Sequence, residues 1–186
     1  MIQCVFVQFS KEDDKMVKDT ILVIDVDVDG IQEIMNILSD SYRICTAGSF
    51  EDALLIIRDI IPELILIDST MSAKDGFDIL EFLKTNDRSS HIPVIFITPL
   101  DNPDFEVRAF DMGSVDYITK PFVPKVVRKR IETQIKLAKY EHKLEELVEE
   151  KVSEIEDMYD IMAISFAGLV ESRDGITGGH LKNNAI

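Results

Sequence analysis

Four apolar residues lead directly into a carboxylate in the segment Leu64-Ile65-Leu66-Ile67-Asp68. A continuous apolar run of this length is typical of a strand that is buried on both faces, as in a parallel sheet covered by helices. Asp68 would then stand at the carboxyl end of the strand, which is the edge where open α/β sheets collect ligands. The run therefore predicts an α/β fold with a functional carboxylate at Asp68.

Short apolar runs alternate with helical patterns over residues 20–124. We expect strands at residues 21–24, 43–47, 64–68, 94–98 and 117–119, with helices at 30–38, from Ser49 to the residue before Pro62, at 77–83 and at 104–112. This alternation is typical of βαβ units and predicts a doubly wound five-stranded parallel sheet with helices on both faces. Residues 1–19 would be an N-terminal extension of this domain.

The composition narrows the classes of partner. The net charge of -15 argues against binding to nucleic acid or to anionic lipid, because phosphates would be repelled. The acidity alone indicates either simple solubility or carboxylates gathered around a cation. The two cysteines, Cys4 and Cys45, have neither metal-ligand spacing nor a disulfide framework, which favours a reducing cytoplasm. No signal peptide or membrane-spanning run is expected.

After Pro124 the pattern changes to that of one long helix, which we expect over residues 125–171. Apolar residues recur at heptad spacing, with Glu141, Lys151 and Ser165 as polar interruptions; the apolar members are Leu137, Leu144, Val148, Ile155, Met158, Met162 and Leu169. The segment from Glu141 to Asp160 contains nine acidic and two basic residues, so the outer faces of the helix are highly charged. This pattern favours a coiled-coil linker that forms a homodimer. A helix packed back on its own domain is the alternative.

Polar side chains follow four of the expected strands. Asp25 and Asp68 end the first and third strands, Thr98 ends the fourth, and Lys120 follows the fifth. Taken singly, each has a structural explanation, such as a helix cap or a solvated lysine. Because these four residues all lie at strand ends, together they predict one polar edge of the sheet. Two neighbouring carboxylates repel each other unless a cation or a shared proton intervenes.

The segment 25–30, Asp-Val-Asp-Val-Asp-Gly, is similar to the start of a calcium-binding EF-hand loop. That loop needs a glutamate at its twelfth position, where this chain has Asn36, and a helix before it, where we expect a strand. Mg²⁺ suits the predicted edge better, because it keeps several waters and favours sites that a phosphoryl group completes. Carboxylate, cation, hydroxyl and lysine together are what phosphoryl transfer to a protein side chain requires.

Residues 20 to about 135 resemble a response-regulator receiver domain. The resemblance rests on the acceptor segment from Ile67 through Asp68 to Phe77, on Thr98 and Tyr117 as switch residues, and on the segment 113–122 around Lys120. It implies phosphorylation of Asp68 by a histidine kinase or a phosphotransfer protein. It also implies a phosphate-binding role for Lys120, a cis peptide bond after it, and Mg²⁺ held by carboxylates and by the backbone carbonyl of Thr70.

Three positions depart from this family. Val26 stands where a second acid normally ligates the metal, and Asp27, one residue later, is only a possible substitute. Ser72 replaces a proline, and Pro99 replaces a small residue after the switch threonine. Val26 would weaken Mg²⁺ binding, and Pro99 would stiffen the loop that answers phosphorylation. A degenerate pseudo-receiver that acts as a phosphorylation-independent dimerisation scaffold is therefore the alternative function.

Residues 164–181 resemble the opening of an HD-GYP domain, a metal-dependent phosphodiesterase of cyclic di-GMP. His180 falls where some members carry a metal ligand, but the partner acid would be at Ile176, and no catalytic motif follows. We therefore expect residues 172–186 to be the truncated start of such an output domain, with a frayed tail as the alternative. No catalytic residue is assigned, and this chain is not expected to be an enzyme. The alternative that it is a fragment of a cyclic di-GMP phosphodiesterase stays open. A flavodoxin-like nucleotide carrier is disfavoured because no glycine-rich phosphate loop follows Asp25.

Overall fold

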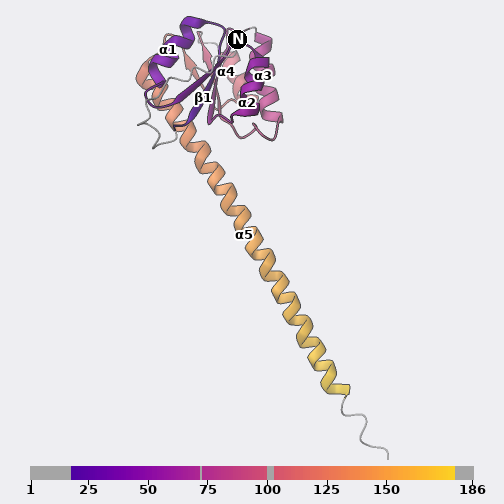
Figure 1. Ribbon diagram of the computed structural model, residues 1–186. Coiled ribbons are helices and arrows are strands. Elements are labelled where there is room, and N and C mark those ends of the chain that lie inside the picture. Colours follow the sequence, from indigo (N-terminus) through magenta and orange to yellow (C-terminus); the bar gives the residue numbers. More distant parts are fainter. Residues whose placement is uncertain (1–17, 72, 100–102, 179–186) are drawn as a thin grey trace, which may run out of the picture. The chain divides into compact units, whose positions relative to one another are not determined.

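The computed structural model describes residues 18–71, 73–99 and 103–178, shown in Figure 1. Five strands alternate with five helices along the chain. The strands are β1 (Thr20–Ile24), β2 (Arg43–Ala47), β3 (Leu64–Asp68), β4 (Val94–Thr98) and β5 (Asp116–Thr119). The helices are α1 (Val28–Leu38), α2 (Phe50–Asp59), α3 (Ala73–Thr85), α4 (Pro103–Asp111) and α5 (Pro124–Gly178).

All five strands pair in parallel in the order β2-β1-β3-β4-β5. The doubly wound sheet predicted from the sequence is confirmed. The central strand, β3, lies between β1 and β4, with Ile24 opposite Ile67 and Asp68 opposite Ile97. The ends of β1, β3 and β4 are thus in register, which brings the polar residues that follow them to one edge.

Helices cover both faces of the sheet (Figure 1). Side chains of α1 and α5 pack on one face, where Ile34 and Ile131 share a core with Leu66. Side chains of α2, α3 and α4 pack on the other, where Ala53, Leu80 and Ala109 share a core with Ile67. Successive strand residues point to opposite faces, so both cores need the unbroken apolar strands seen in the sequence.

The helices near the sheet edge begin at side-chain caps. Asp27 caps α1 by accepting from the backbone N–H groups of Asp29 and Gly30, and Ser49 caps α2 by accepting from the N–H of Asp52. These oxygens satisfy donors that have no partner inside the helix. After α4 the chain turns at Gly113, whose φ of 96° is a conformation that glycine adopts without a side-chain penalty.

Helix α5 runs from Pro124 to Gly178, beyond the end expected at residue 171. The chain divides into two compact units, one up to Lys139 and one from Tyr140 onward. In the first unit, Val127, Ile131 and Ile135 of α5 are buried in the core. In the second, every described side chain from Tyr140 to Phe166 is exposed. Within the described ranges, none of the helices has an apolar stretch that could cross a membrane.

Candidate functional site

The carboxyl edge of the sheet holds the polar residues that the sequence placed there. Asp25 directly follows β1, Asp68 and Thr98 end β3 and β4, and Lys120 directly follows β5. Three of these side chains are almost completely buried: Asp25 is 2% exposed, Asp68 is 0% exposed and Thr98 is 3% exposed. Charged groups are costly to bury without partners, so this edge is a built polar site rather than an accident of surface composition.

Lys120 is the cation of this site. Its Nζ lies 2.5 Å from Oδ2 of Asp68 and 3.7 Å from Oδ2 of Asp25. The peptide bond between Lys120 and Pro121 is cis, as the family resemblance implied. One ammonium group thus faces two buried carboxylates, and the three groups together carry one net negative charge when all are ionised.

The other oxygen of Asp68 is bound by Thr70. Both the backbone N–H and the hydroxyl of Thr70 donate to Oδ1 of Asp68 at 2.6 Å. The backbone N–H of Asp27 donates in the same way to Oδ1 of Asp25 at 2.8 Å. Each carboxylate is therefore held by the turn that follows its own strand, which fixes both groups at the edge.

Burial and charge move the pKa values of the site in different directions. Burial raises the pKa of Asp25 from its ordinary 3.8 to about 6, and the negative charge of Asp68 adds to this, against the opposing N–H of Asp27. Burial would also raise the pKa of Asp68, but hydrogen bonds from Lys120 and Thr70 outweigh it and hold that pKa below its usual value. Burial would lower the pKa of Lys120, but the carboxylates raise it. Asp68 is thus the more acidic carboxylate of the pair.

Gly30 keeps the space beside these charges open. A Cβ at this position would lie 3.0 Å from Oδ2 of Asp25, 3.0 Å from Nζ of Lys120 and 3.3 Å from Oδ2 of Asp27. Any side chain at position 30 would therefore crowd the site. Sequence reasoning noted Gly30 only as part of a calcium-loop-like segment and missed this role, because no local pattern shows which groups a glycine faces.

The oxygen ligands at this edge are fewer than the family pattern provides. Val26 offers no ligand and is 59% exposed, and both oxygens of Asp27 accept backbone N–H groups of α1. Across residues 18–71, 73–99 and 103–178, no group of three or more histidine, cysteine, aspartate or glutamate side chains is arranged to hold a metal ion. Asp25 and Asp68 are the carboxylates that remain, and the Thr70 carbonyl is the third oxygen that the family resemblance implies. Hard oxygens of this kind suit Mg²⁺, with waters in its other positions.

Tyr117 lies apart from the charged groups. Its ring meets that of Phe110 edge-on, with centroids 6.0 Å apart, and the guanidinium of Arg130 lies 5.8 Å from the ring centroid. Tyr117 is paired with Phe96 across β4 and β5, so it lies next to the aromatic cluster under α4. This environment links the sheet edge to α4 and α5 through one aromatic side chain.

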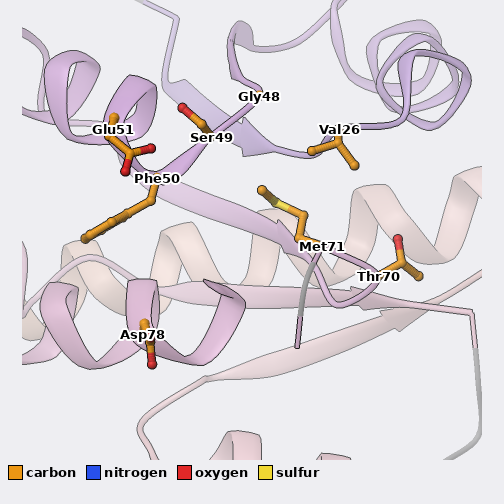
Figure 2. Close-up of a pocket in the computed structure, with 8 residues that line it drawn as sticks. All are labelled: Val26, Gly48, Ser49, Phe50, Glu51, Thr70, Met71 and Asp78. Carbon is orange, nitrogen blue, oxygen red and sulfur yellow. The ribbon is translucent and has the colours of Figure 1, made fainter. Parts of the chain in front are cut away.

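A pocket of 360 Å³ adjoins the site, and Figure 2 shows Met71 extending between the Val26 loop and the start of α2. Val26 and Thr70 both line it, together with Phe50 and the acidic residues Glu51 and Asp78. Val26 therefore supplies an apolar wall where the family pattern has an acid.

Some predicted positions stay untested. Pro99 directly follows β4 and is exposed. Ser72 and His180 lie outside the described residues. The structure brings Asp25, Asp68, Thr98 and Lys120 to one edge, and their roles remain predictions until measured.

Known proteins share this sequence and fold. The family model of the response regulator receiver domain matches residues 21–132. A probable cyclic di-GMP phosphodiesterase of Vibrio cholerae serotype O1 is 34% identical over 169 residues, which are 87% of this chain and 38% of that protein. The phosphate regulon transcriptional regulatory protein PhoB of Pseudomonas aeruginosa is 30% identical over 123 residues, which are 65% of this chain and 53% of that protein.

Among solved structures, NtrX from Brucella abortus has a TM-score of 0.65 and 29% identity, over 70% of this chain and 30% of that one. A parallel five-stranded sheet with a buried carboxylate edge is the fold of receiver domains. The chain belongs to the response regulator receiver family, and it spans about half or less of the length of most of the curated relatives it matches. Response regulators of this family act in two-component signalling.

Proposed function

We propose that Asp68 accepts a phosphoryl group from a histidine kinase or a phosphotransfer protein. The observation that carries this proposal is the contact of Lys120 with Asp68 at 2.5 Å, at a buried edge that also holds Asp25 and Thr98. A carboxylate oxygen of Asp68 attacks the phosphorus of the donor's phosphohistidine. The new P–O bond forms as the P–N bond breaks, and the imidazole leaves and takes up a proton.

The residues of this chain supply most of what the transfer needs. Lys120 offers a cation to the incoming phosphoryl oxygens, and Thr70 holds the acceptor carboxylate in place through two hydrogen bonds. Thr98, at the end of β4, would offer its hydroxyl to the phosphoryl group. Asp25, Asp68 and the Thr70 carbonyl would hold Mg²⁺, which when bound neutralises phosphoryl charge.

Phosphorylation would change the surface formed by α4, β5 and α5, and Tyr117 would be the side chain that transmits the change. Thr98 is drawn toward the phosphoryl oxygens and Tyr117 turns inward, which alters its contacts with Phe110 and Arg130. We propose that α5, as a dimeric helical linker, carries this change to an output domain. Exposure of the helix beyond Tyr140 supports a homodimer. The charge of -15 argues against binding to nucleic acid or anionic lipid, and the cysteine pattern favours the cytoplasm.

Incubation with Mg²⁺ and acetyl phosphate, followed by peptide mass mapping, tests the proposal. We expect an adduct of one phosphoryl group on the peptide that contains Asp68. Asp68→Asn should abolish the adduct, whereas the matched variant Asp87→Asn, at an exposed position, should not. Absence of the adduct at saturating Mg²⁺ and donor contradicts phosphorylation of this chain.

Val26 favours a second candidate, the pseudo-receiver that acts as a scaffold. Here Lys120 would face the two carboxylates without help from a metal, and no Mg²⁺ would bind. Titration with Mg²⁺ separates the two functions, because only the phosphorylated receiver needs a measurable site.

The Vibrio cholerae relative favours a third candidate, a piece of a cyclic di-GMP phosphodiesterase whose output domain is of the HD-GYP type. The region that carries this resemblance, residues 164–181, offers no complete catalytic motif. We therefore propose no turnover by this chain itself. Hydrolysis of cyclic di-GMP by the purified chain would contradict this assignment.

A further inference from the structure

Helix α5 carries an apolar stripe that the described residues of its own chain leave exposed. From Leu137 onward the stripe follows positions that alternate by four and three residues, with the charged residues Glu141 and Lys151 at two of them. Leu137, Leu144, Val148, Ile155, Met158 and Met162 belong to this stripe, and each is at least 48% exposed. A stripe at this spacing is the seam of a coiled coil. In heptad terms Val148, Ile155 and Met162 are a positions, and Leu137, Leu144 and Met158 are d positions.

The residues beside the seam distinguish the possible orientations of a second helix. The g positions are Tyr140, Leu147, Glu154 and Ile161, and the e positions include Glu145, Val152, Tyr159 and Phe166. In a parallel pair each g residue meets the e residue five places later in the other copy. The four meetings are Tyr140 with Glu145, Leu147 with Val152, Glu154 with Tyr159, and Ile161 with Phe166.

None of these four meetings opposes like charges, and two join apolar side chains. We infer that α5 pairs in parallel and in register with α5 of a second copy of this chain, from Leu137 to at least Phe166. This inference rests on the proposed homodimer and deepens it by fixing the orientation and the register.

An antiparallel pair fits less well. The register that sets Glu141 against Met158 and Val148 against Lys151 opposes no like charges, but it places both charged seam residues against apolar side chains. It also leaves Phe166 beside Ile131 of the other copy, which is already buried in the sheet unit. If the two helices overlap fully, Glu154 of one copy meets Glu154 of the other. If they are shifted so that Glu141 of each copy faces Lys151 of the other, two ion pairs form. In this register, however, Glu145 of one copy faces Glu145 of the other. This shift also leaves Met158, Ile161, Met162 and Phe166 alongside residues 126–136 of the other copy, where α5 is already buried in the sheet unit.

The parallel pair contains two weak layers. Glu141, at an a position, faces Glu141 of the other copy, and Lys151, at a d position, faces Lys151 of the other copy. Nζ of Lys151 lies 2.8 Å from a carboxylate oxygen of Glu154 in its own helix, which partly neutralises its charge. Polar residues inside a coiled-coil seam fix its register at a cost in stability. The segment 141–151 is therefore the loosest part of the seam, between apolar layers on either side.

Disulfide formation between copies tests the register in the full chain. In a Cys4→Ser background, Leu144→Cys places a thiol at a d position, and Ser153→Cys places one at an outward f position as the matched control. Both positions are exposed in the single chain, and the native Cys45 is buried. Under mild oxidation we expect a covalent dimer from Leu144→Cys and none from Ser153→Cys or from the background chain.

The outcomes separate the orientation from the proposed function. If Leu144→Cys fails alone but an equal mixture with Val148→Cys forms the dimer, the pair is antiparallel and this inference is wrong, while the homodimer stands. If no variant cross-links and sedimentation shows a single copy, then both the register and the homodimer are overturned. Phosphorylation of Asp68, measured on the same chain by mass, is independent of either result.

Substitution of Lys151 should change the dissociation constant of the dimer in opposite directions for the parallel and the antiparallel orientation. Lys151→Leu removes a facing pair of cations from the parallel seam, so the dissociation constant of the dimer should fall roughly tenfold or more. In the shifted antiparallel pair the same change breaks two ion pairs with Glu141 and should raise that constant. Sedimentation equilibrium of the variant and of the native chain decides between them.

Discussion

Strands β3 and β4 bury every residue, whereas every described side chain of α5 from Tyr140 to Phe166 is exposed. Both regions contain several isoleucine, leucine and valine residues. The strands lie between two layers of helices from the same chain, but the helical segment has no such layer among the described residues. Burial on folding stabilises the first region, and only association would stabilise the second in the same way. The same residue types therefore build a core in one region and, in the proposed dimer, an interface in the other.

The largest expected effect is in the sheet. Leu66→Ala empties space in the centre of β3, where the side chain is 0% exposed, and should lower the free energy of unfolding by about 2–5 kcal/mol. Urea denaturation followed by circular dichroism measures this loss. A loss below about 1 kcal/mol would mean that the core is far looser than its burial indicates.

The next effect concerns the buried carboxylate pair. Because the pKa of Asp25 is about 6 in the fold against 3.8 ordinarily, the folded chain binds this proton more tightly than the unfolded chain. The free energy of unfolding should therefore fall as pH rises through the window from about 4 to about 6, and then level off. Asp25→Asn should remove this slope and stabilise the fold at pH 7.5 by on the order of 2 kcal/mol without Mg²⁺.

The matched control for this prediction is Asp59→Asn, at an exposed position of α2. It should leave the pH dependence unchanged. Denaturation curves between pH 5 and pH 7.5 provide the measurement, and a slope in Asp25→Asn equal to that of the native chain would show that another group titrates.

A smaller effect concerns the metal. Val26→Asp restores an acid beside Asp25, and an additional carboxylate ligand should strengthen Mg²⁺ binding roughly tenfold, or about 1.4 kcal/mol. Titration calorimetry compares this variant with Val28→Asp, which adds the same charge two residues away at an exposed position. Equal gains from both variants would point to long-range charge rather than to ligation.

The smallest expected effect is in the helix. Ile155→Ala should change the stability of the sheet unit by less than about 0.5 kcal/mol, because the side chain is exposed and lies outside that unit. The same change should weaken the homodimer. Hydrogen exchange of the β3 amides measures stability, and sedimentation measures association; faster exchange in β3 would break the contrast between the two regions.

The strands were predicted well because their apolar runs are long and uninterrupted. The predicted bounds of β2, β3 and β4 match the structure, and those of β1 and β5 differ by one residue at the start. The end of α5 was harder to predict, since a charged helix without proline has no local signal that fixes where it stops. Asp27 was predicted as a possible metal ligand, but its oxygens cap α1, a choice that depends on where the helix begins.

The sequence by itself determined the parallel sheet, the strand that ends in Asp68 and the heptad stripe of α5, because periodicity and apolar runs are local properties of a chain. Only the tertiary structure decided that Lys120 contacts Asp68 across 52 positions of sequence, that Thr70 binds the opposite oxygen, and that Gly30 leaves the adjoining space open. Such contacts depend on which strands become neighbours and on their register, and these are set by the packing of the whole sheet.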